Sequence, residues 1–520
     1  MTSARVPFTR YPGLAPLFLD FLQGLPEVYP DPPTPEACAA RGRELLGTRA
    51  RVPASVWRCR SDEAKAQAEA LAQGRSVAAV AGHQVGVFTG PLYTLTKAFD
   101  AVRAAREISA RGVPAAGAFW ALTDDHDLEE IARTAWPGPE GPEVAVLDGA
   151  DRTNRAPVGG LRVPDRVTEI LENLRAAGKA PDSEDVARLF RSRYSGGPTY
   201  ADAFIETLLD LVDPDPLLVL DPMNESLRAA MSEFFAIAVE RRREIGEALA
   251  HAALRLERRN REAPVPYRTG VFPFFLIEDG ERRRVTDPVE ALRKVRDGAA
   301  WPSPDVLTRP IVKSFLIPTA ASVLGPAEIA YHAQSLVLYP VFGLKPPVLL
   351  PRSHLILLGP PERRAAEALG VPLEDLLHET PPPAVASLPE ADEIERLARE
   401  LREKLSAIEP KLARIDPSLT AALETTREKA TYPLQQFQER IRKAAERRDT
   451  TTVTRRKKLE TMLRPNGTAA ERLYPPLVPM LAYGKDVLRA IREAATGSLE
   501  GAAVVNLGPG PRAEGEADAG

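Results

Sequence analysis

A glycine-rich segment at residues 82–91, with the sequence GHQVGVFTGP, contains the first residues that could do chemistry. Glycines let backbone N–H groups approach a ligand closely, and the helix expected from Tyr93 onward adds the positive end of its dipole. This combination suits a phosphate or a carboxylate, although the spacing matches neither the Walker loop nor the dinucleotide fingerprint. A tight structural turn is the alternative interpretation. We expect substrate contacts from Gly82, His83, Gln84, Gly86, Thr89, Gly90 and Tyr93.

A cluster of carboxylates around a histidine lies at residues 123–127, with the sequence TDDHD. Crowded carboxylates raise one another's pKa, and they raise the pKa of a histidine that they surround. Such a cluster could bind a substrate amino group, hold Mg²⁺ or transfer a proton. A helix N-cap followed by an acidic first turn is the alternative. We predict that Asp125, His126 and Asp127 are catalytic.

A third candidate is the segment 325–332, with the sequence GPAEIAYH. Glu328 and His332 are four residues apart, so a helix would place them on one face. Two ligands at this spacing can bind a metal ion, but the further ligand of a zinc-protease motif is missing. A helix start that faces the substrate is favoured over a metal site, with a capped structural helix as the alternative. We therefore expect Glu328, Tyr331 and His332 to bind substrate.

The surrounding pattern of apolar residues predicts the elements that position these segments. Apolar runs at 76–81 and 115–122 indicate buried strands, and the spacing between them indicates a helix over about 93–111. Strand, glycine loop, helix and strand form a βαβ unit of a parallel sheet, which binds ligands beyond the carboxyl ends of its strands. Further strands are expected at 216–221, 272–278, 309–318 and 347–351, and a long helix at 225–260.

Apolar residues recur at steps of three or four beyond the triple proline at 381–383, as in a coiled-coil or helical-hairpin seam. The seam consists of Ile394, Leu397, Leu401, Leu405, Ile408, Leu412, Ile415 and Leu419. Pro410 and Pro417 are expected to kink or segment it. Because one helix cannot bury this seam alone, we expect a dimer interface at residues 390–495. Packing within a helical hairpin is the alternative.

Composition limits the classes of function. A net charge of -4 over 520 residues gives no basic footprint for nucleic acid. Two cysteines, Cys38 and Cys59, are too few for a disulfide scaffold or for a metal site of three or four thiolates. The sequence shows no signal peptide and no run of roughly 20 apolar residues. We expect a cytoplasmic protein that binds no membrane, no nucleic acid and no structural metal.

Several blocks of the sequence, in this order along the chain, resemble the cysteine-adding ligases of bacillithiol biosynthesis. They are GHQVGVFTGPLY at 82–93, FWALTDDHD at 119–127, the stretch 303–334, PVLLPR at 347–352, RPNGTAAER at 464–472 and Tyr483-Gly484. The resemblance covers nearly the whole chain, and the combination is specific although each block alone is not. The sequence departs from the family at His83, where glutamine is usual, at Lys313-Ser314, in place of a Gln-Asp-like pair, and at Thr468–Ala470, in place of a stretch with Leu-Gln.

The resemblance implies a Rossmann-like α/β core with inserted segments and a C-terminal coiled coil that forms a homodimer. It implies the addition of L-cysteine to glucosaminyl-malate, which gives bacillithiol. Nucleotide binding is associated with the family, so ATP or ADP is the expected cofactor, with Mg²⁺ accompanying it. Asn466 and Gly467 are candidate nucleotide contacts. The alternatives are a non-catalytic, nucleotide-sensing coiled-coil dimer and a ligase for a different amino-sugar thiol.

We divide the chain accordingly. An N-terminal arm at residues 1–60 packs on the core, and the Rossmann-like catalytic core occupies 61–380, with inserted segments at about 140–300. A helical coiled-coil domain follows at 381–495, and residues 496–520, rich in Gly, Pro, Ala and Glu, are expected to be disordered.

Overall fold

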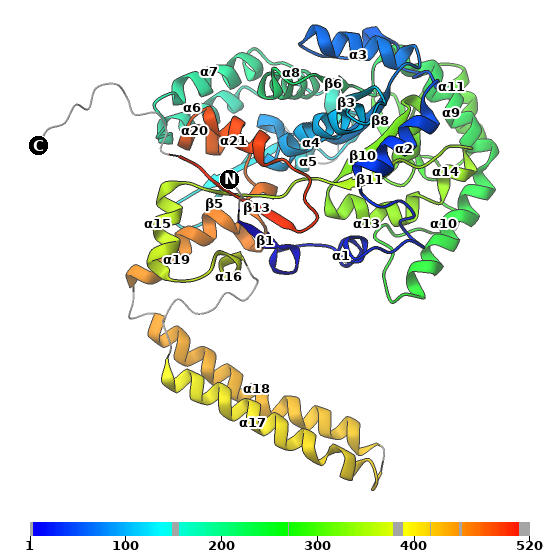
Figure 1. Ribbon diagram of the computed structural model, residues 1–520. Helices are drawn as coiled ribbons and strands as arrows, with labels where there is room; N and C mark the ends of the chain where they lie inside the picture. Colours follow the sequence, from blue (N-terminus) through cyan, green and yellow to red (C-terminus); the bar gives the residue numbers. More distant parts are fainter. Residues whose placement is uncertain are drawn as a thin grey trace, which may run out of the picture.

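The computed structural model describes residues 4–147, 155–268, 270–377, 388–416, 418–446 and 450–508. A layered body contains most of the chain, and two long helices project from it (Figure 1). The predicted domain break at 381–383, the predicted kink at Pro417 and residues 509–520 of the predicted tail lie outside the described residues. In the part of the chain that the structure describes, no helix is long and apolar enough to cross a membrane.

A five-stranded parallel sheet lies at the centre of the body, which confirms the predicted α/β fold. Its strands, in spatial order, are β11 (Val348–Pro351), β10 (Thr319–Leu324), β2 (Val77–Gln84), β3 (Ala115–Leu122) and β6 (Leu217–Leu220). The chain runs outward from β2 to β3 and β6, and then returns to β10 on the other side of β2. The order in which the chain adds strands therefore reverses between β2 and β10. Open α/β sheets bind ligands at such a switch point.

Helices cover both faces of this sheet, and the strands are apolar for that reason. Successive residues of β2 alternate between two hydrophobic cores, with Ala78 and Val80 in one and Ala79 and Ala81 in the other. The buried helix α4 (Leu92–Ser109) follows β2 and packs on β2 and β3. The helices of the N-terminal arm and of the β2 approach are α1 (Pro16–Leu22), α2 (Pro35–Leu45) and α3 (Asp62–Ala72).

Two insertions lengthen the connections of the sheet. The first, between β3 and β6, contains α5 (Leu128–Ile131), the hairpin of β4 (Arg133–Pro137) and β5 (Pro142–Val146), and helices α6 (Arg166–Ala177), α7 (Ser183–Tyr194) and α8 (Tyr200–Val212). The second, between β6 and β10, contains α9 (Arg228–Glu240), α10 (Arg242–Glu257), the antiparallel strands β7 (Phe274–Glu278), β8 (Glu281–Arg284) and β9 (Trp301–Pro304), and helices α11 (Pro288–Arg296) and α12 (Arg309–Leu316). Helices α13 (Pro326–Ser335) and α14 (Leu338–Val341) then lead from β10 to β11.

The second insertion contradicts two of our predictions. The segment 309–318 is not a strand, because residues 309–316 form helix α12. Its start is prepared by Asp305, whose carboxylate accepts hydrogen bonds from the N–H groups of Leu307 and Thr308, and by Pro310 in the first turn. The long helix expected at 225–260 is divided into α9 and α10, because Arg241 between them leaves the helical conformation.

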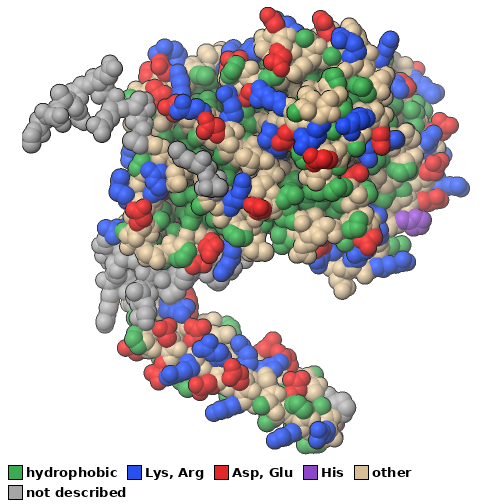
Figure 2. Space-filling view, viewed as in Figure 1, with side chains coloured by type: hydrophobic (Ala, Val, Ile, Leu, Met, Phe, Trp, Pro, Cys, Tyr) green, Lys and Arg blue, Asp and Glu red, His purple; other side chains and the backbone are tan. Residues whose placement is uncertain are grey.

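The projecting pair consists of α17 (Pro389–Leu412) and α18 (Leu419–Glu446), which form an antiparallel hairpin. Hydrogen bonds join Glu395 to Gln438 and Arg402 to Thr431 across the pair. Pro410 lies inside α17, which continues to Leu412, so the helix is not segmented at this residue, and a kink there stays a prediction. The hairpin leaves part of the seam uncovered, and Figure 2 shows hydrophobic side chains exposed among its charged ones.

After the hairpin, the chain returns to the body. Helix α19 (Thr450–Leu463) packs on α15 (Pro360–Leu369) and α16 (Leu373–Leu377), and α20 (Leu477–Tyr483) and α21 (Asp486–Ala494) pack on α7 and α4. Strand β13 (Gly501–Asn506) lies between β1 (Arg5–Pro7) and β12 (Leu355–Leu358). The prediction of disorder is therefore wrong for residues 501–506, because their apolar side chains are buried in this second sheet.

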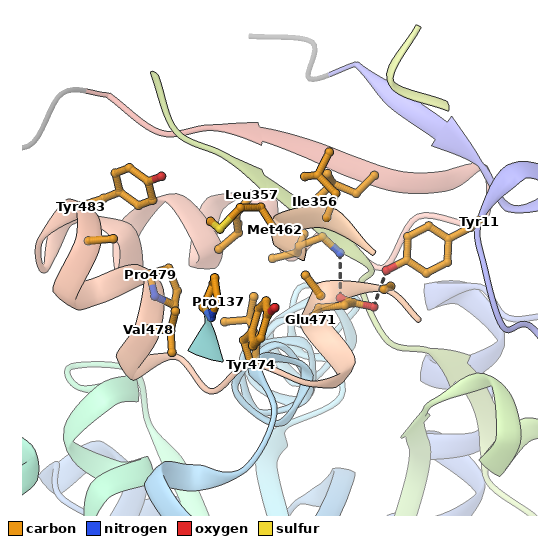
Figure 3. A pocket seen from close by; sticks show the side chains of 16 residues that line it. Tyr11, Pro137, Ile356, Leu357, Met462, Glu471, Tyr474, Val478, Pro479 and Tyr483 are labelled. Atoms are coloured by element: carbon orange, nitrogen blue, oxygen red, sulfur yellow. Dashed lines mark hydrogen bonds between the residues drawn. The ribbon is translucent and has the colours of Figure 1, made fainter. Parts of the chain in front are cut away.

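The N-terminal arm and the segment that follows the hairpin meet at one buried carboxylate, Glu471, which lies beside a small apolar pocket of about 60 Å³ (Figure 3). The Tyr11 hydroxyl donates to its Oε1 over 2.8 Å, and the Leu355 N–H donates to its Oε2 over 2.9 Å. Arg352 forms an ion pair with it at 2.8 Å, and Nδ1 of His354 is 3.0 Å away. Burial would raise the pKa of Glu471, but Arg352 and His354 hold it well below its usual range.

We predict that Glu471→Ala destabilises the protein by about 3–5 kcal/mol, because it leaves the buried Arg352 guanidinium without its partner carboxylate. The loss is measured as a change in the free energy of unfolding in urea. Glu500→Ala is the matched control, since Glu500 is exposed and its ion pair with Arg5, at 3.8 Å, is worth at most about 1 kcal/mol. Equal effects of the two substitutions would show that Glu471 does not hold these two segments together.

Candidate active site

A cavity of about 310 Å³ opens at the switch point of the sheet, at the carboxyl ends of β2 and β10. Its wall combines residues from β2, β3, α4, α12, α13 and the segments that follow β11 and α19. The lining residues are Gly82, His83, Gln84, Tyr93, Lys97, Leu122, Asp125, Glu130, Val306, Arg309, Gly325, Pro326, Ala327, Glu328, Tyr331, Arg352 and Arg472. The position agrees with the rule for ligand binding in open α/β sheets.

The glycine-rich segment contributes only its first part to this cavity. Of the predicted contacts in it, Gly82, His83, Gln84 and Tyr93 line the wall, and Gly86, Thr89 and Gly90 do not. Thr89 and Gly90 have positive φ angles of 70° and 68°, and the Thr89 N–H donates to the Tyr194 hydroxyl over 3.1 Å. Residues 86–90 are thus the tight turn that was the alternative interpretation, and the turn connects β2 to α4.

An ion pair closes the base of the cavity. The buried Lys97 Nζ lies 2.5 Å from Oε2 of Glu328 and donates a hydrogen bond to the Gly82 carbonyl over 2.9 Å. The same Oε2 accepts the Gly325 N–H over 2.6 Å, at the start of α13. Burial would raise the pKa of Glu328, but Lys97 and this hydrogen bond lower it to about 2. Glu328 is therefore a permanent anion that ties α13 to α4 and β2.

His83 is a neutral side chain in this wall. Burial and the nearby Lys97 ammonium lower its pKa to about 3, so it carries no charge at neutral pH. Its ring meets the Tyr93 ring edge-on, with 4.9 Å between the centroids. Gln84 donates to Asp125 Oδ2 over 3.4 Å, and its own Oε1 is buried with no partner among the described residues. Both side chains can exchange hydrogen bonds with a bound ligand.

The predicted catalytic cluster is separated by the fold. Asp125 lines the cavity, whereas Asp127 accepts the Glu130 N–H over 3.2 Å as the N-cap of α5. His126 does not line the cavity, because its Nδ1 and Nε2 face the guanidinium groups of Arg282, at 2.9 Å, and Arg155, at 3.2 Å. Asp127 thus corresponds to the helix-cap alternative, and of the three predicted residues only Asp125 reaches the site.

Asp125 is held as an anion. Its Oδ1 accepts a hydrogen bond from Arg282 Nη1 over 3.2 Å, and its Oδ2 lies 3.8 Å from Arg309. Burial would raise the pKa of Asp125, but the hydrogen bonds from His126 and the two guanidinium groups hold it well below its usual range. Glu130 differs from it, because burial and the neighbouring Asp127 raise the pKa of Glu130.

The cations of the site were missed at the sequence level. Lys97, Arg309, Arg352 and Arg472 line the cavity against the carboxylates of Asp125, Glu130 and Glu328. Arg352 is neutralised by Glu471, and Glu328 by Lys97. The remaining charged groups of the wall are the carboxylates of Asp125 and Glu130 and the guanidinium groups of Arg309 and Arg472, which suit a ligand with both positive and negative groups. The available signal was weak, because Lys97 is one of five charged residues in α4, and Arg309 begins a segment whose apolar pattern predicts a strand.

Lys313 lies one helical turn after Arg309 and is also buried. Burial and the neighbouring cations Lys97 and Arg309 lower its pKa to about 8, against the opposing effect of Glu328. From the sequence alone, Lys313 was known only as a departure from the pattern of the cysteine-adding ligases. In the structure it adds a cation behind the wall that Arg309 forms.

The remaining predicted residues divide between the cavity and other places. Tyr331 lines the cavity, but His332 is fully buried outside it. Its Nδ1–H donates a hydrogen bond to the Glu328 carbonyl over 2.7 Å. Asn466 and Gly467 form an exposed turn with φ angles of 52° and 79° and do not line the cavity, so nucleotide binding there stays a prediction. Among the described residues, no group of three or more His, Cys, Asp or Glu side chains is placed to hold a metal ion.

Comparison with known proteins gives a single family. The model "Bacillithiol biosynthesis BshC, N-terminal Rossmann-like domain" matches residues 43–353, and "Bacillithiol biosynthesis BshC, C-terminal coiled-coil domain" matches residues 365–506. A protein of Koribacter versatilis named "Putative cysteine ligase BshC" is 28% identical over 94% of this chain and 97% of its own length. Proteins of the same name from Solibacter usitatus and Salinibacter ruber are each 28% identical, over 80% and 83% of this chain and 82% and 83% of their own lengths. The chain belongs to the BshC family of bacillithiol biosynthesis.

Proposed function

We propose that this chain is a cysteine ligase, which joins the carboxyl group of L-cysteine to the amine of glucosaminyl-malate to form bacillithiol. The observation that carries the proposal is the mixed charge of the cavity at the β2–β10 switch point. Asp125 and Glu130 offer negative charge for an ammonium group, and Arg309 and Arg472 offer positive charge for carboxylates. Cysteine brings an ammonium group, and malate brings two carboxylates.

The reaction needs an activated carboxyl group, because a carboxylate and an amine do not condense at neutral pH. We propose that ATP supplies the activation. A cysteine carboxylate oxygen attacks a phosphorus atom of ATP, and the bond from that phosphorus to its leaving phosphate breaks. The glucosamine nitrogen then attacks the acyl carbon, the acyl C–O bond breaks and the phosphorylated group departs, while the nitrogen loses a proton. Mg²⁺ would accompany the nucleotide, since it is commonly held by phosphates with one or two carboxylates.

The cavity suggests a role for each side chain. Asp125 stays ionised and is suited to hold the cysteine ammonium group. Glu130 has a raised pKa and is the better acceptor for the proton of the attacking amine. Arg472 lines the cavity and forms no ion pair among the described residues, so it is suited to bind a malate carboxylate through its planar N–H groups. His83 remains neutral and can donate or accept one hydrogen bond.

The test is to incubate the purified protein with L-cysteine, glucosaminyl-malate and ATP, and to follow bacillithiol by mass spectrometry. We expect Asp125→Asn to lower kcat/KM by roughly tenfold to a hundredfold, the effect of losing a charge-assisted hydrogen bond of about 1.5–3 kcal/mol. Asp287→Asn is the matched control and should keep activity, because Asp287 caps α11 outside the cavity and asparagine also caps a helix.

Each outcome of this assay separates the proposal from its alternatives. Product formed from another amino-sugar acceptor, and not from glucosaminyl-malate, would favour a ligase for a different thiol. ATP binding without product from any acceptor would favour the nucleotide-sensing dimer. Equal losses in the Asp125 and Asp287 variants would remove the assignment of the cavity as the active site.

The role of Glu130 has its own test in the pH dependence of kcat/KM. A proton acceptor must be ionised, so the rate should rise with pH through the pKa of Glu130, and burial places that limb above the ordinary value of 4.5. Glu130→Gln should lower the rate by roughly a hundredfold and abolish the limb, since 10²–10⁴-fold is the usual contribution of a general base. A Gln variant with an unchanged acid limb would assign the proton transfer to another group.

We also propose that the protein is a cytoplasmic homodimer joined through the α17–α18 hairpin. Both cysteines are free thiols, which suits a reducing compartment. Leu397 on α17 and Phe437 on α18 lie at the same level of the hairpin and are 46% and 52% exposed, and Tyr432 nearby is 60% exposed. A second copy would cover these side chains as a coiled-coil partner does.

The double variant Leu397→Glu, Phe437→Glu should therefore sediment as a monomer at micromolar concentration, where the native chain sediments as a dimer. Buried like charges at the centre of an interface oppose association. Leu254→Glu is the matched control, because Leu254 is 49% exposed on α10 of the body and should leave the dimer intact. A native chain that is monomeric under these conditions would contradict the proposal.

A further inference from the structure

A second cavity of about 490 Å³ adjoins the first. The two share Asp125, Val306 and Arg309 in their walls. The rest of the second cavity comes from the small sheet β7–β9 and from the segments around it. These lining residues are Val265, Pro266, Tyr267, Arg268, Val271, Pro273, Phe275, Arg282, Arg284, Asp305 and Leu307. The volume is within the range of about 300–1,000 Å³ that is usual for small-molecule sites.

The charge of this second cavity is mostly positive. Four guanidinium groups line it, from Arg268, Arg282, Arg284 and Arg309. Its two carboxylates already have partners within the protein. Asp305 accepts the N–H groups of Leu307 and Thr308 over 2.9 and 3.1 Å at the start of α12. Asp125 accepts from Arg282.

Strand β8 builds one wall with alternating arginines. Residues two apart on a strand share a face, so Arg282 and Arg284 point to the same side and Arg283 to the other. Their guanidinium carbons lie 3.9 and 4.5 Å from the centroid of the Phe275 ring. Arg283 instead pairs with Glu281 at 2.7 Å. Stacking on Phe275 supports the guanidinium plane of Arg284 and leaves its N–H edge for a ligand.

Three of the four guanidinium groups lack a close carboxylate. In the described part of the chain, Arg268 and Arg284 form no ion pair, and the single ion pair of Arg309 is the 3.8 Å contact with Asp125. The Arg309 side chain is only 12% exposed, and its Nε is buried without a hydrogen-bond partner among the described residues. A buried donor of this kind needs an acceptor, and phosphate oxygens match the fork of N–H groups on arginine.

We propose that the second cavity binds the polyphosphate group of a nucleoside triphosphate, with Arg309 between this group and the substrates in the first cavity. The proposal rests on the proposed function, which requires a phosphate donor beside a carboxylate. Several unpaired arginines around one space favour a ligand with several negative charges over a single carboxylate. The shared wall at Asp125 and Arg309 would bring the phosphorus atom next to the cysteine carboxylate, as an in-line attack requires.

The test is calorimetric titration of the full-length protein with ATP and, separately, with inorganic tripolyphosphate, in the absence of cysteine and acceptor. We expect both ligands to bind and Arg284→Gln to weaken both by tenfold or more. Arg283→Gln, on the opposite face of the same strand, should change either Kd by less than twofold. Arg268→Gln is the second variant, in case the Arg284 variant does not fold as judged by its thermal unfolding.

The outcomes are distinct from those of the proposed function. Binding of ATP that neither Arg284→Gln nor Arg268→Gln weakens would overturn the inference, even if the protein forms bacillithiol. Binding of ATP without binding of tripolyphosphate would also overturn it, because the base and not the phosphates would then be recognised. Binding of both ligands through Arg284, in a protein that forms no amide, would support the inference and contradict the ligase.

Discussion

The buried ion pair between Lys97 and Glu328 is the interaction on which the arrangement of the site depends. It joins the helix after β2 to the helix after β10, on the two sides of the switch point of the sheet. Burying two charges is costly unless their remaining hydrogen bonds are made. Here Lys97 also donates to the Gly82 carbonyl at the end of β2, and Glu328 also accepts the Gly325 N–H before α13. The same ion pair therefore holds the backbone at both glycines.

A second buried anion extends this arrangement to the N-terminal arm and the segment that follows the hairpin. Glu471 gathers Tyr11 from the N-terminal arm, Arg352 from the end of β11 and the backbone of Leu355 at the start of β12. Arg352 lines the cavity, so the C-terminal segment that returns from the hairpin takes part in the geometry of the site. The hairpin is therefore an excursion between two parts of one body, and the residues on both sides of it are needed to complete the cavity wall.

The two cavities divide the charges of the site in a way that suits a reaction between several charged molecules. The first has carboxylates and cations facing one another, which fits a zwitterion and a dicarboxylate. The second is lined by arginines whose carboxylate neighbours already have partners. Arg309 and Asp125 stand between them. The single ion pair of Arg309, with Asp125, is 3.8 Å long, so Arg309 retains capacity for a ligand.

The sequence by itself determined the class of fold and the two turns at the switch point. Apolar runs at 76–81 and 115–122 with a helix between them predict β2, α4 and β3, because a strand buried on both faces has no other pattern to adopt. Gly82 marks the place where β2 approaches the backbone of β3 too closely for a side chain, and Gly325 precedes the start of α13. The seam at 394–419 likewise predicts long helices with an apolar stripe, since apolar periodicity is a local property of the chain, but it left open whether a second copy or a helical hairpin covers that stripe.

Only the tertiary structure decided which polar residues share the site. Asp125 and Asp127 are two aspartates of the same short segment, and the sequence gives no reason to prefer either as a site residue. In the fold Asp125 lines the cavity and Asp127 caps α5, because the backbone turns between them, and hydrophobic periodicity does not predict such a turn. Arg309 was expected in a strand, and Lys97, Arg352 and Arg472 come from three segments that are more than a hundred residues apart. Their roles depend on which charges surround them after folding, because electrostatic energy is set by distance in space and by burial.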